Sequence, residues 1–329
     1  MSTSSLTSSD HHGPPTVTEE WQERVLHHEL SVTPGPTLLC IGSLHGNEPA
    51  GALALQRVAD TLQSNEVTPA HGELLFLVGN LQALRAGRRF LQRDLNRGWR
   101  REAVRRVQEF GPISTEDVEM LELDEHIQHC QDTARGPLVF LDLHTTSSQS
   151  PPFASVVDQE FSRELSRQLP VPTILGMDDH LDGTLLEELD RHEFSGVIFE
   201  GGQHDEPTSV DHNEAATWLM IEALDFLPAD PPAEITRRLD WARQLLEEVG
   251  SHYPRLLRIH YRHPVDETSD FTMRPGFRSF EEVAHGDLLA HDRGGEIRSH
   301  LDARVLMPLY QAQGDDGFFL IREAPDDTV

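Results

Sequence analysis

The chain has 329 residues, enough for two domains of ordinary size. Its formal net charge is −29 and all 27 basic residues are arginine, so its surface should repel nucleic acids and anionic membranes. No apolar stretch approaches the roughly 20 residues of a membrane-spanning helix, and two cysteines are too few for a disulfide framework. We therefore expect a cytoplasmic protein with no nucleic-acid or membrane partner, and its oligomeric state stays open.

The acidic, lysine-free composition has two interpretations. A solvated acidic surface is the simpler one. Adaptation to high intracellular salt is the more specific one, because abundant counterions would screen the repulsion among the carboxylates.

Three parts of the chain differ in their pattern. Residues 1–15 are rich in Ser, Thr, His and Pro and should form a mobile tail. Residues 16–251 alternate strand-length apolar runs with helical patterns, which is typical of an α/β domain. Residues 252–329 carry short β-type runs between turns rich in Gly and Asp, so we expect a small all-β domain at the C-terminus.

The stretch TLLCIGSLHGNEPAG at residues 37–51 predicts a buried strand, a Gly-rich turn and a helix. His45 and Glu48 stand in the turn, and Pro49 suits the first position of the helix. In an open α/β sheet, ligands bind beyond the carboxyl ends of the strands. The turn is therefore a candidate site.

His144 and Glu200 share this placement, because each lies at the end of an apolar run that should be a parallel strand. Parallel strands end at one edge of the sheet, so these side chains can converge with those of the turn. A catalytic zinc takes three nitrogen or oxygen ligands and keeps one position for water. His45, Glu48 and His144 supply such a set for one zinc ion per chain. Glu200 is then the candidate general base toward the zinc-activated water.

The H-x-x-E spacing alone is a weak signal, since a chain this rich in His and Glu contains it roughly once or twice by chance. Its position beside the other strand ends gives it weight. The remaining histidine groups lack this context, and we expect them to be structural or exposed: those at 27–28, 126 and 129, and 260 and 263.

Six arginines between Arg85 and Arg100 reverse the local charge of an otherwise acidic chain. An anionic ligand is the simplest explanation. The alternative is a set of surface pairs with carboxylates, which suits Arg100 and Arg101 better than the RDLNR segment at 93–97.

Four motifs resemble, in order, those of the succinylglutamate desuccinylase/aspartoacylase family, a branch of the zinc carboxypeptidase-like fold. They are HGNE at 45–48, GNLQALRAGRRFLQRDLNR at 79–97, DLHTT at 142–146 and FEGG at 199–202. The resemblance implies a mixed, mostly parallel sheet flanked by helices, with a small C-terminal β domain. It also implies a zinc-dependent amide hydrolase that removes the acyl group from a small, carboxylate-bearing N-acyl amino acid.

The resemblance assigns roles to particular residues. The family's zinc ligands correspond to His45, Glu48 and His144, and its catalytic acid/base corresponds to Glu200. Arg89 matches the arginine that polarises the scissile carbonyl.

Two further positions, Asn96 and Arg97, match the pair that holds a substrate carboxylate. Asp94 is expected to orient Arg89 or Arg97. Asp142 is a candidate partner for the second ring nitrogen of His144, although the alternation of strand side chains argues against this contact.

The chain departs from the aspartoacylase pattern in two places. Arg191 is near the position of a further substrate-binding arginine, and residues 317–320 offer phenylalanine where a tyrosine is expected. Which acyl amino acid is the substrate therefore stays open. Two alternative functions also remain: a zinc carboxypeptidase acting on small peptides, and a non-catalytic zinc-binding protein of the same fold. Dinucleotide binding is excluded, because GSLHGNEPAG is not a G-x-G-x-x-G motif.

Overall fold

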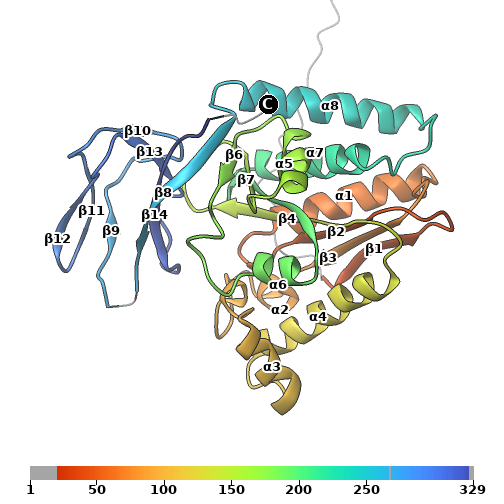
Figure 1. Ribbon diagram of the computed structural model, residues 1–329, viewed down its shortest axis with the longest axis horizontal. Helices are drawn as coiled ribbons and strands as arrows, with labels where there is room; N and C mark the ends of the chain where they lie inside the picture. Colours follow the sequence, from red (N-terminus) through yellow and green to blue (C-terminus); the bar gives the residue numbers. More distant parts are fainter. Residues whose placement is uncertain (1–20, 267, 326–329) are drawn as a thin grey trace, which may run out of the picture.

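A computed structural model describes residues 21–266 and 268–325 (Figure 1). The tail expected at residues 1–15 lies outside the described residues. The helices are α1 (Ala50–Ser64), α2 (Leu81–Arg85), α3 (Arg101–Phe110), α4 (Thr115–Thr133), α5 (Glu160–Arg167), α6 (Leu185–Arg191), α7 (Thr208–Ala223) and α8 (Ala233–Gly250), with a 3₁₀ turn, η1, at Leu95–Arg97. None of the helices described is both long and apolar enough to cross a lipid bilayer.

Eleven strands of the described chain form one sheet, in the order β1-β3-β2-β4-β7-β5-β6-β8-β14-β13-β10. The strands of its first part are β1 (Val25–Leu30), β2 (Thr37–Gly42), β3 (Glu73–Val78), β4 (Leu138–Thr146), β5 (Phe153–Val156), β6 (Thr173–Leu175), β7 (Ser195–Gln203) and β8 (Leu256–Pro264). Five of the seven strand pairs from β1 to β8 are parallel. The predicted mixed, mostly parallel sheet flanked by helices is confirmed.

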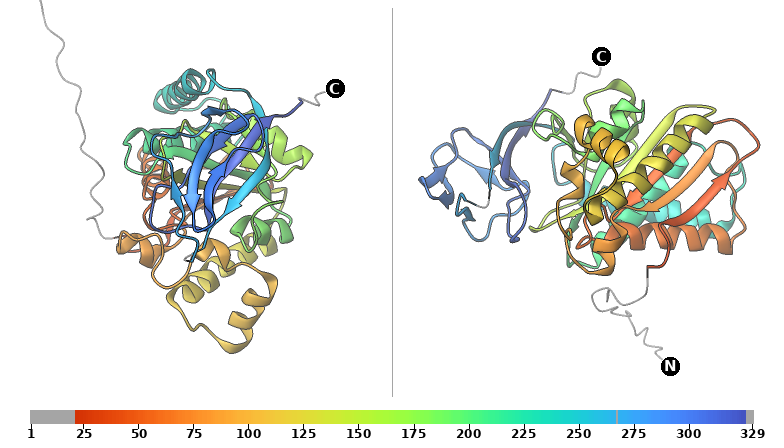
Figure 2. Two further views of the ribbon diagram at one scale, coloured as in Figure 1. Left: turned by 90° about the vertical axis from the view of Figure 1, so that its left-hand side faces the viewer. Right: turned by 90° about the horizontal axis from the view of Figure 1, so that it is seen from below.

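Helices cover both faces of this sheet (Figures 1 and 2). Apolar residues of α1, α5, α7 and α8 form one core with one face, and those of α3, α4 and α6 form a second core with the other. The apolar run of β2 is continuous because both faces of this strand are buried. Leu38 and Cys40 pack in the first core, and Leu39 and Ile41 pack in the second. Both cysteines are buried and free.

The sequence pattern does not predict strand β5. Its four residues follow a Ser/Pro-rich loop and lie antiparallel to β7 and parallel to β6. A run this short carries no periodicity of its own, and pairing with two neighbours stabilises it.

A small C-terminal β region is confirmed. Its strands are β9 (Thr272–Met273), β10 (Glu282–Val283), β11 (Leu288–Asp292), β12 (Gly295–Arg298), β13 (Ala303–Leu306) and β14 (Asp316–Glu323). Three of them extend the large sheet beyond β8, and β12-β11-β9 form a second sheet that projects from the molecule (Figure 2). The division into domains at residues 251 and 252 stays a prediction.

Candidate metal centre and active site

The turn after β2 carries the first two groups of the site. Gly46 is needed there, because a Cβ atom would lie 2.1 Å from the backbone of Ala83 in α2. The Gly46 N–H donates to the carbonyl of Arg89 at 3.0 Å. The turn is thereby held so that buried His45 and Glu48 face each other, with Nδ1 of His45 2.9 Å from Oε1 of Glu48.

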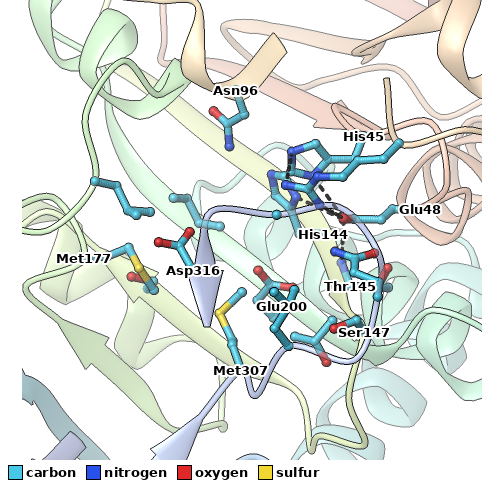
Figure 3. Close-up of a pocket in the computed structure, with 18 of the residues that line it drawn as sticks. His45, Glu48, Asn96, His144, Thr145, Ser147, Met177, Glu200, Met307 and Asp316 are labelled. Carbon is cyan, nitrogen blue, oxygen red and sulfur yellow. Dashed lines mark hydrogen bonds and ion pairs between the residues drawn. The ribbon is translucent and has the colours of Figure 1, made fainter. Parts of the chain in front are cut away.

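Strand β4 brings His144 to the same carboxylate, because it pairs in parallel with β2 and ends at the same edge. Nδ1 of His144 lies 3.1 Å from Oε2 of Glu48. The N–H of Thr145 donates to that oxygen at 3.0 Å. The ligand atoms of His45, Glu48 and His144 all lie within 4.8 Å of one another (Figure 3), so the three predicted ligands converge.

The second ring nitrogen of each histidine is held by another group. Nε2 of His144 lies 3.0 Å from Oδ2 of Asp142. The expectation that strand alternation separates these residues is wrong, since residues two apart on a strand share a face. Nε2 of His45 lies 3.3 Å from Oδ1 of Asp94 and 2.9 Å from Nη2 of Arg89. Both Nδ1 atoms are thus left to face a common ligand position.

This donor set fits zinc. Two imidazoles and a carboxylate are common zinc ligands, and the other nitrogen of a ligating histidine is usually held by a second group. Burial alone would raise the pKa of Glu48, but His45 and His144 hold it well below its usual range. Burial alone would lower the pKa of His144, but Asp142 and Glu48 hold it well above its usual range. The ionised form of Glu48 is the one that binds a metal, and a bound cation would displace the proton that these carboxylates favour on His144.

Glu200 faces this cluster from β7, where it is directly opposite His144 in the strand register. Its side chain is buried, and Oε2 has no hydrogen-bond partner among the described residues. Burial raises the pKa of Glu200 to about 8, with a further upward contribution from Glu48 and Asp142. Glu200 also lines the pocket, and a buried carboxyl group with an unpartnered oxygen is suited to meet a water molecule or a substrate.

Arg89 is the member of the arginine cluster that reaches the ligand set. Its Nη1 lies 3.5 Å from Oε1 of Glu48. Its Nε and Nη2 donate to Oδ2 of Asp94 at 3.2 and 3.0 Å. Asp94 also accepts from the Asn96 N–H at 2.8 Å, which caps η1. Asp94 therefore orients Arg89, as expected.

Asn96 and Arg97 both line the pocket. Oδ1 of Asn96 accepts from the Leu185 N–H at 2.8 Å, which turns the amide nitrogen toward the pocket (Figure 3). Arg97 instead meets the C-terminal region. It donates to both oxygens of Asp315, from Nε at 2.9 Å and from Nη2 at 3.0 Å, and to Oδ2 of Asp316 at 2.7 Å. The guanidinium fork expected to hold a substrate carboxylate is therefore held by two protein carboxylates.

Other arginines of the cluster also have carboxylate partners. Arg93 pairs with buried Asp117, and Arg100 pairs with Asp182 at the surface. Pairing with carboxylates was expected for Arg100 and Arg101, and it extends to the arginines of the RDLNR segment as well.

The pocket opens to solvent, and the space among its lining residues, open solvent included, is about 850 Å³. Much of its wall is apolar, formed by Phe153, Met177, Leu181, Ile198, Met307, Leu309 and Phe319. His204 adds a polar group that the sequence pattern does not single out. Its Nδ1 lies 2.7 Å from Oγ1 of Thr145, and its Nε2 lies 3.3 Å from Oε1 of Gln311. The sequence signal that could have indicated His204 is its position four residues after Glu200, just beyond the end of β7.

The expected departures from the aspartoacylase pattern have different outcomes. Phe319 lines the pocket where a tyrosine is expected. Arg191 does not reach the pocket; it pairs with Glu188 and donates to the carbonyl of Trp99.

Two other groups of potential ligands lie elsewhere in the described chain: His28, Glu73 and His129, and Asp124, Glu188 and His192. Nε2 of His28 lies 2.8 Å from Oε1 of Glu73, and His28 and His129 are partly exposed. This agrees with a structural or exposed role for these histidines.

Residues 34–203 match the succinylglutamate desuccinylase/aspartoacylase catalytic domain. The match covers more than half of the 329 residues. The chain belongs to this family. Its relatives include a succinylglutamate desuccinylase from Ectopseudomonas mendocina, 25% identical over 82% of this chain and 81% of the relative. A second, from Pseudomonas paraeruginosa, is 43% identical over 74 residues, which span only 22% of that protein.

Solved structures support the fold of this family member. A succinylglutamate desuccinylase/aspartoacylase from Rhodobacter sphaeroides superposes with a TM-score of 0.64 at 17% identity, covering 89% of this chain and 87% of the other. The ectoine utilization protein EutE from Ruegeria pomeroyi superposes with a TM-score of 0.62 at 19% identity, covering 90% and 87%. Both likenesses extend well beyond the matched domain and therefore include the C-terminal β region.

Proposed function

We propose that this chain is a zinc-dependent amide hydrolase that removes the acyl group from an N-acyl amino acid. The observation that carries the proposal is the buried cluster of His45, Glu48 and His144, in which both Nδ1 atoms face one carboxylate beside the unpartnered Oε2 of Glu200. Membership of the succinylglutamate desuccinylase/aspartoacylase family supports the reaction class. A cytoplasmic location is part of the same proposal.

His45, Glu48 and His144 would hold the zinc ion. A bound zinc ion would act as a Lewis acid, which lowers the pKa of water and polarises a carbonyl group. Glu200 accepts the proton of the attacking water and delivers it to the leaving amide nitrogen. Arg89 donates hydrogen bonds to the carbonyl oxygen as negative charge develops on it.

Asn96 and Arg97 would bind the substrate carboxylate. The amide nitrogen of Asn96 faces the pocket, and the planar fork of Arg97 suits a bidentate carboxylate. Because Arg97 is paired with Asp315, a substrate carboxylate has to take the place of that side chain. Asp315 is 43% exposed and can turn into solvent, so this exchange is feasible.

The carboxypeptidase alternative receives less support from the pocket. Met307, Leu309 and Gln311, from the segment between β13 and β14, form part of its wall. This segment narrows the space available to a long peptide.

A panel of N-acetyl, N-formyl and N-succinyl amino acids, assayed with and without a chelator, tests the proposal. We expect hydrolysis of at least one compound, its loss with chelator and its return with added zinc. Metal analysis of the purified protein should give one zinc per chain. Zinc far below one per chain together with no hydrolysis would favour the non-catalytic alternative.

A further inference from the structure

The charged groups of the pocket are already paired. Apart from the ligand set and Glu200, the charged residues lining it are Arg89, Arg97, Asp315 and Asp316. Arg89 is paired with Asp94 at 3.0 Å, and Arg97 is paired with both aspartates. Among the described pocket residues, neither arginine is free to bind a carboxylate without giving up a partner.

At Arg97 a ligand carboxylate can replace one of the two aspartates, but it cannot replace both. Asp315 is partly exposed and can be displaced into solvent. Asp316 is only 18% exposed and is held from the other side by Arg262 of β8. It therefore stays in place when a ligand binds. Arg97 and Arg262 are then both engaged, by Asp316 and by the first ligand carboxylate, so a second ligand carboxylate beside Asp316 would meet its negative charge without a free arginine among the described pocket residues.

The polar side chains of Thr145 and Ser147 lie on the side of the pocket near Glu48, whereas the wall beside Asp316 is largely apolar (Figure 3). Met177 and Met307 lie beside Asp316 and Glu200 (Figure 3), and the apolar residues Leu181, Phe153 and Phe319 also line the pocket. Moving a carboxylate from water to such a wall is strongly unfavourable, whereas an uncharged group of the same size gains from the contact.

We infer that the pocket selects N-acyl amino acids with a single carboxylate, and that Asp316 is a specificity-determining residue that excludes substrates with a second one. The acyl group and the amino-acid side chain are uncharged. This inference rests on the proposed function and names its substrate class. It separates the chain from relatives whose names refer to succinylglutamate, which carries additional carboxylates.

The test compares ligands that differ only in the second carboxylate: N-acetylasparagine with N-acetylaspartate, and N-butyrylalanine with N-succinylalanine. With the zinc-loaded wild-type protein, kcat/KM should be at least roughly tenfold higher for the uncharged member of each pair. Binding of the same pairs to zinc-loaded Glu200→Gln, by calorimetry, should show the same order. Equal or tighter binding of the dicarboxylates would overturn the inference.

Asp316→Asn isolates the specificity role. It should raise the affinity for N-acetylaspartate relative to N-acetylasparagine roughly three- to tenfold, a ratio that a loss of structural support alone would leave unchanged. Asp240→Asn makes the same charge change at an exposed site on α8 and should leave the ratio unchanged. An unchanged ratio in Asp316→Asn would overturn the inference. If no compound is hydrolysed but the binding order holds, the proposed function fails and the selectivity stands.

Discussion

Asp142 and His144 lie two residues apart on β4, on the same face of the strand, and Oδ2 of Asp142 is 3.0 Å from Nε2 of His144. Both side chains are buried. The carboxylate thus determines which imidazole nitrogen is left to face Glu48, and it favours the ring orientation seen in the cluster.

Asp142→Asn should weaken zinc binding roughly 10- to 100-fold, because the neutral amide supports the imidazole less well as a ligand. Zinc titration against a competing chelator measures the change, and circular dichroism checks the fold. Asp211→Asn is the matched control, since Asp211 is 44% exposed and pairs only with residues outside the pocket. Unchanged zinc affinity in Asp142→Asn would show that the contact is not needed for metal binding.

Glu200→Gln should retain one zinc per chain and lose turnover by roughly 100- to 10,000-fold, because glutamine cannot accept a proton. Its similar shape keeps the buried position filled. Metal analysis and the hydrolysis assay are made on the same preparation. Substantial hydrolysis by this variant would remove Glu200 from the role of general base.

Arg89→Lys should lower kcat by roughly 100-fold while leaving KM nearly unchanged, since the charge is kept but the planar guanidinium group that Asp94 orients is lost. Arg100→Lys is the control, because Arg100 is 60% exposed and pairs with Asp182 away from the ligand set. If instead KM rises and kcat is retained, Arg89 contributes to binding rather than to stabilising the transition state.

The parts of the site that the apolar runs of the sequence predict share one property: they lie near strand ends. His45, His144 and Glu200 follow apolar runs, and the parallel pairing of β2, β4 and β7 brings those ends to one edge. The order of the strands then makes the convergence of the three side chains a consequence of the fold.

The partner of Arg97 illustrates what the sequence does not predict. Asp315 is 218 positions away in the chain and lies in a turn without periodicity, so only the docking of the C-terminal region brings the two together. If Arg97 binds the substrate carboxylate as expected, that carboxylate has to compete with the side chain of Asp315. The sequence does not predict His204 or β5 for a similar reason. Contacts with distant segments, rather than a local sequence pattern, place His204 in the pocket and hold β5 in the sheet.

Asp117 should make the stability of the fold sensitive to acid. It is fully buried, pairs with Arg93 and Arg106, and accepts from the Ile113 N–H at 2.9 Å. Burial alone would raise the pKa of Asp117, but these partners lower it to about 2. A carboxyl group whose pKa is lower in the folded state stabilises the fold above its unfolded pKa and loses this effect as pH falls through the folded one.

Asp117→Asn should therefore lower the free energy of unfolding by about 2 kcal/mol at pH 6, and the difference from wild type should shrink between pH 4 and pH 2. Urea unfolding across this pH range measures it. Asp240→Asn, at a side chain that is 75% exposed, should show almost no difference. A difference that stays constant with pH would mean that packing, not charge, is responsible.

The net charge of −29 should make the folded state more stable at high salt. Carboxylates on a compact surface repel one another, and the screening length falls to about 3 Å at 1 M salt, which removes most of this repulsion. The Tm should rise by several degrees between dilute buffer and molar KCl. NaCl at the same ionic strength should have the same effect, since screening does not depend on the identity of the cation. A response confined to one cation would indicate specific ion binding, and a Tm no higher in molar KCl would contradict adaptation to high salt.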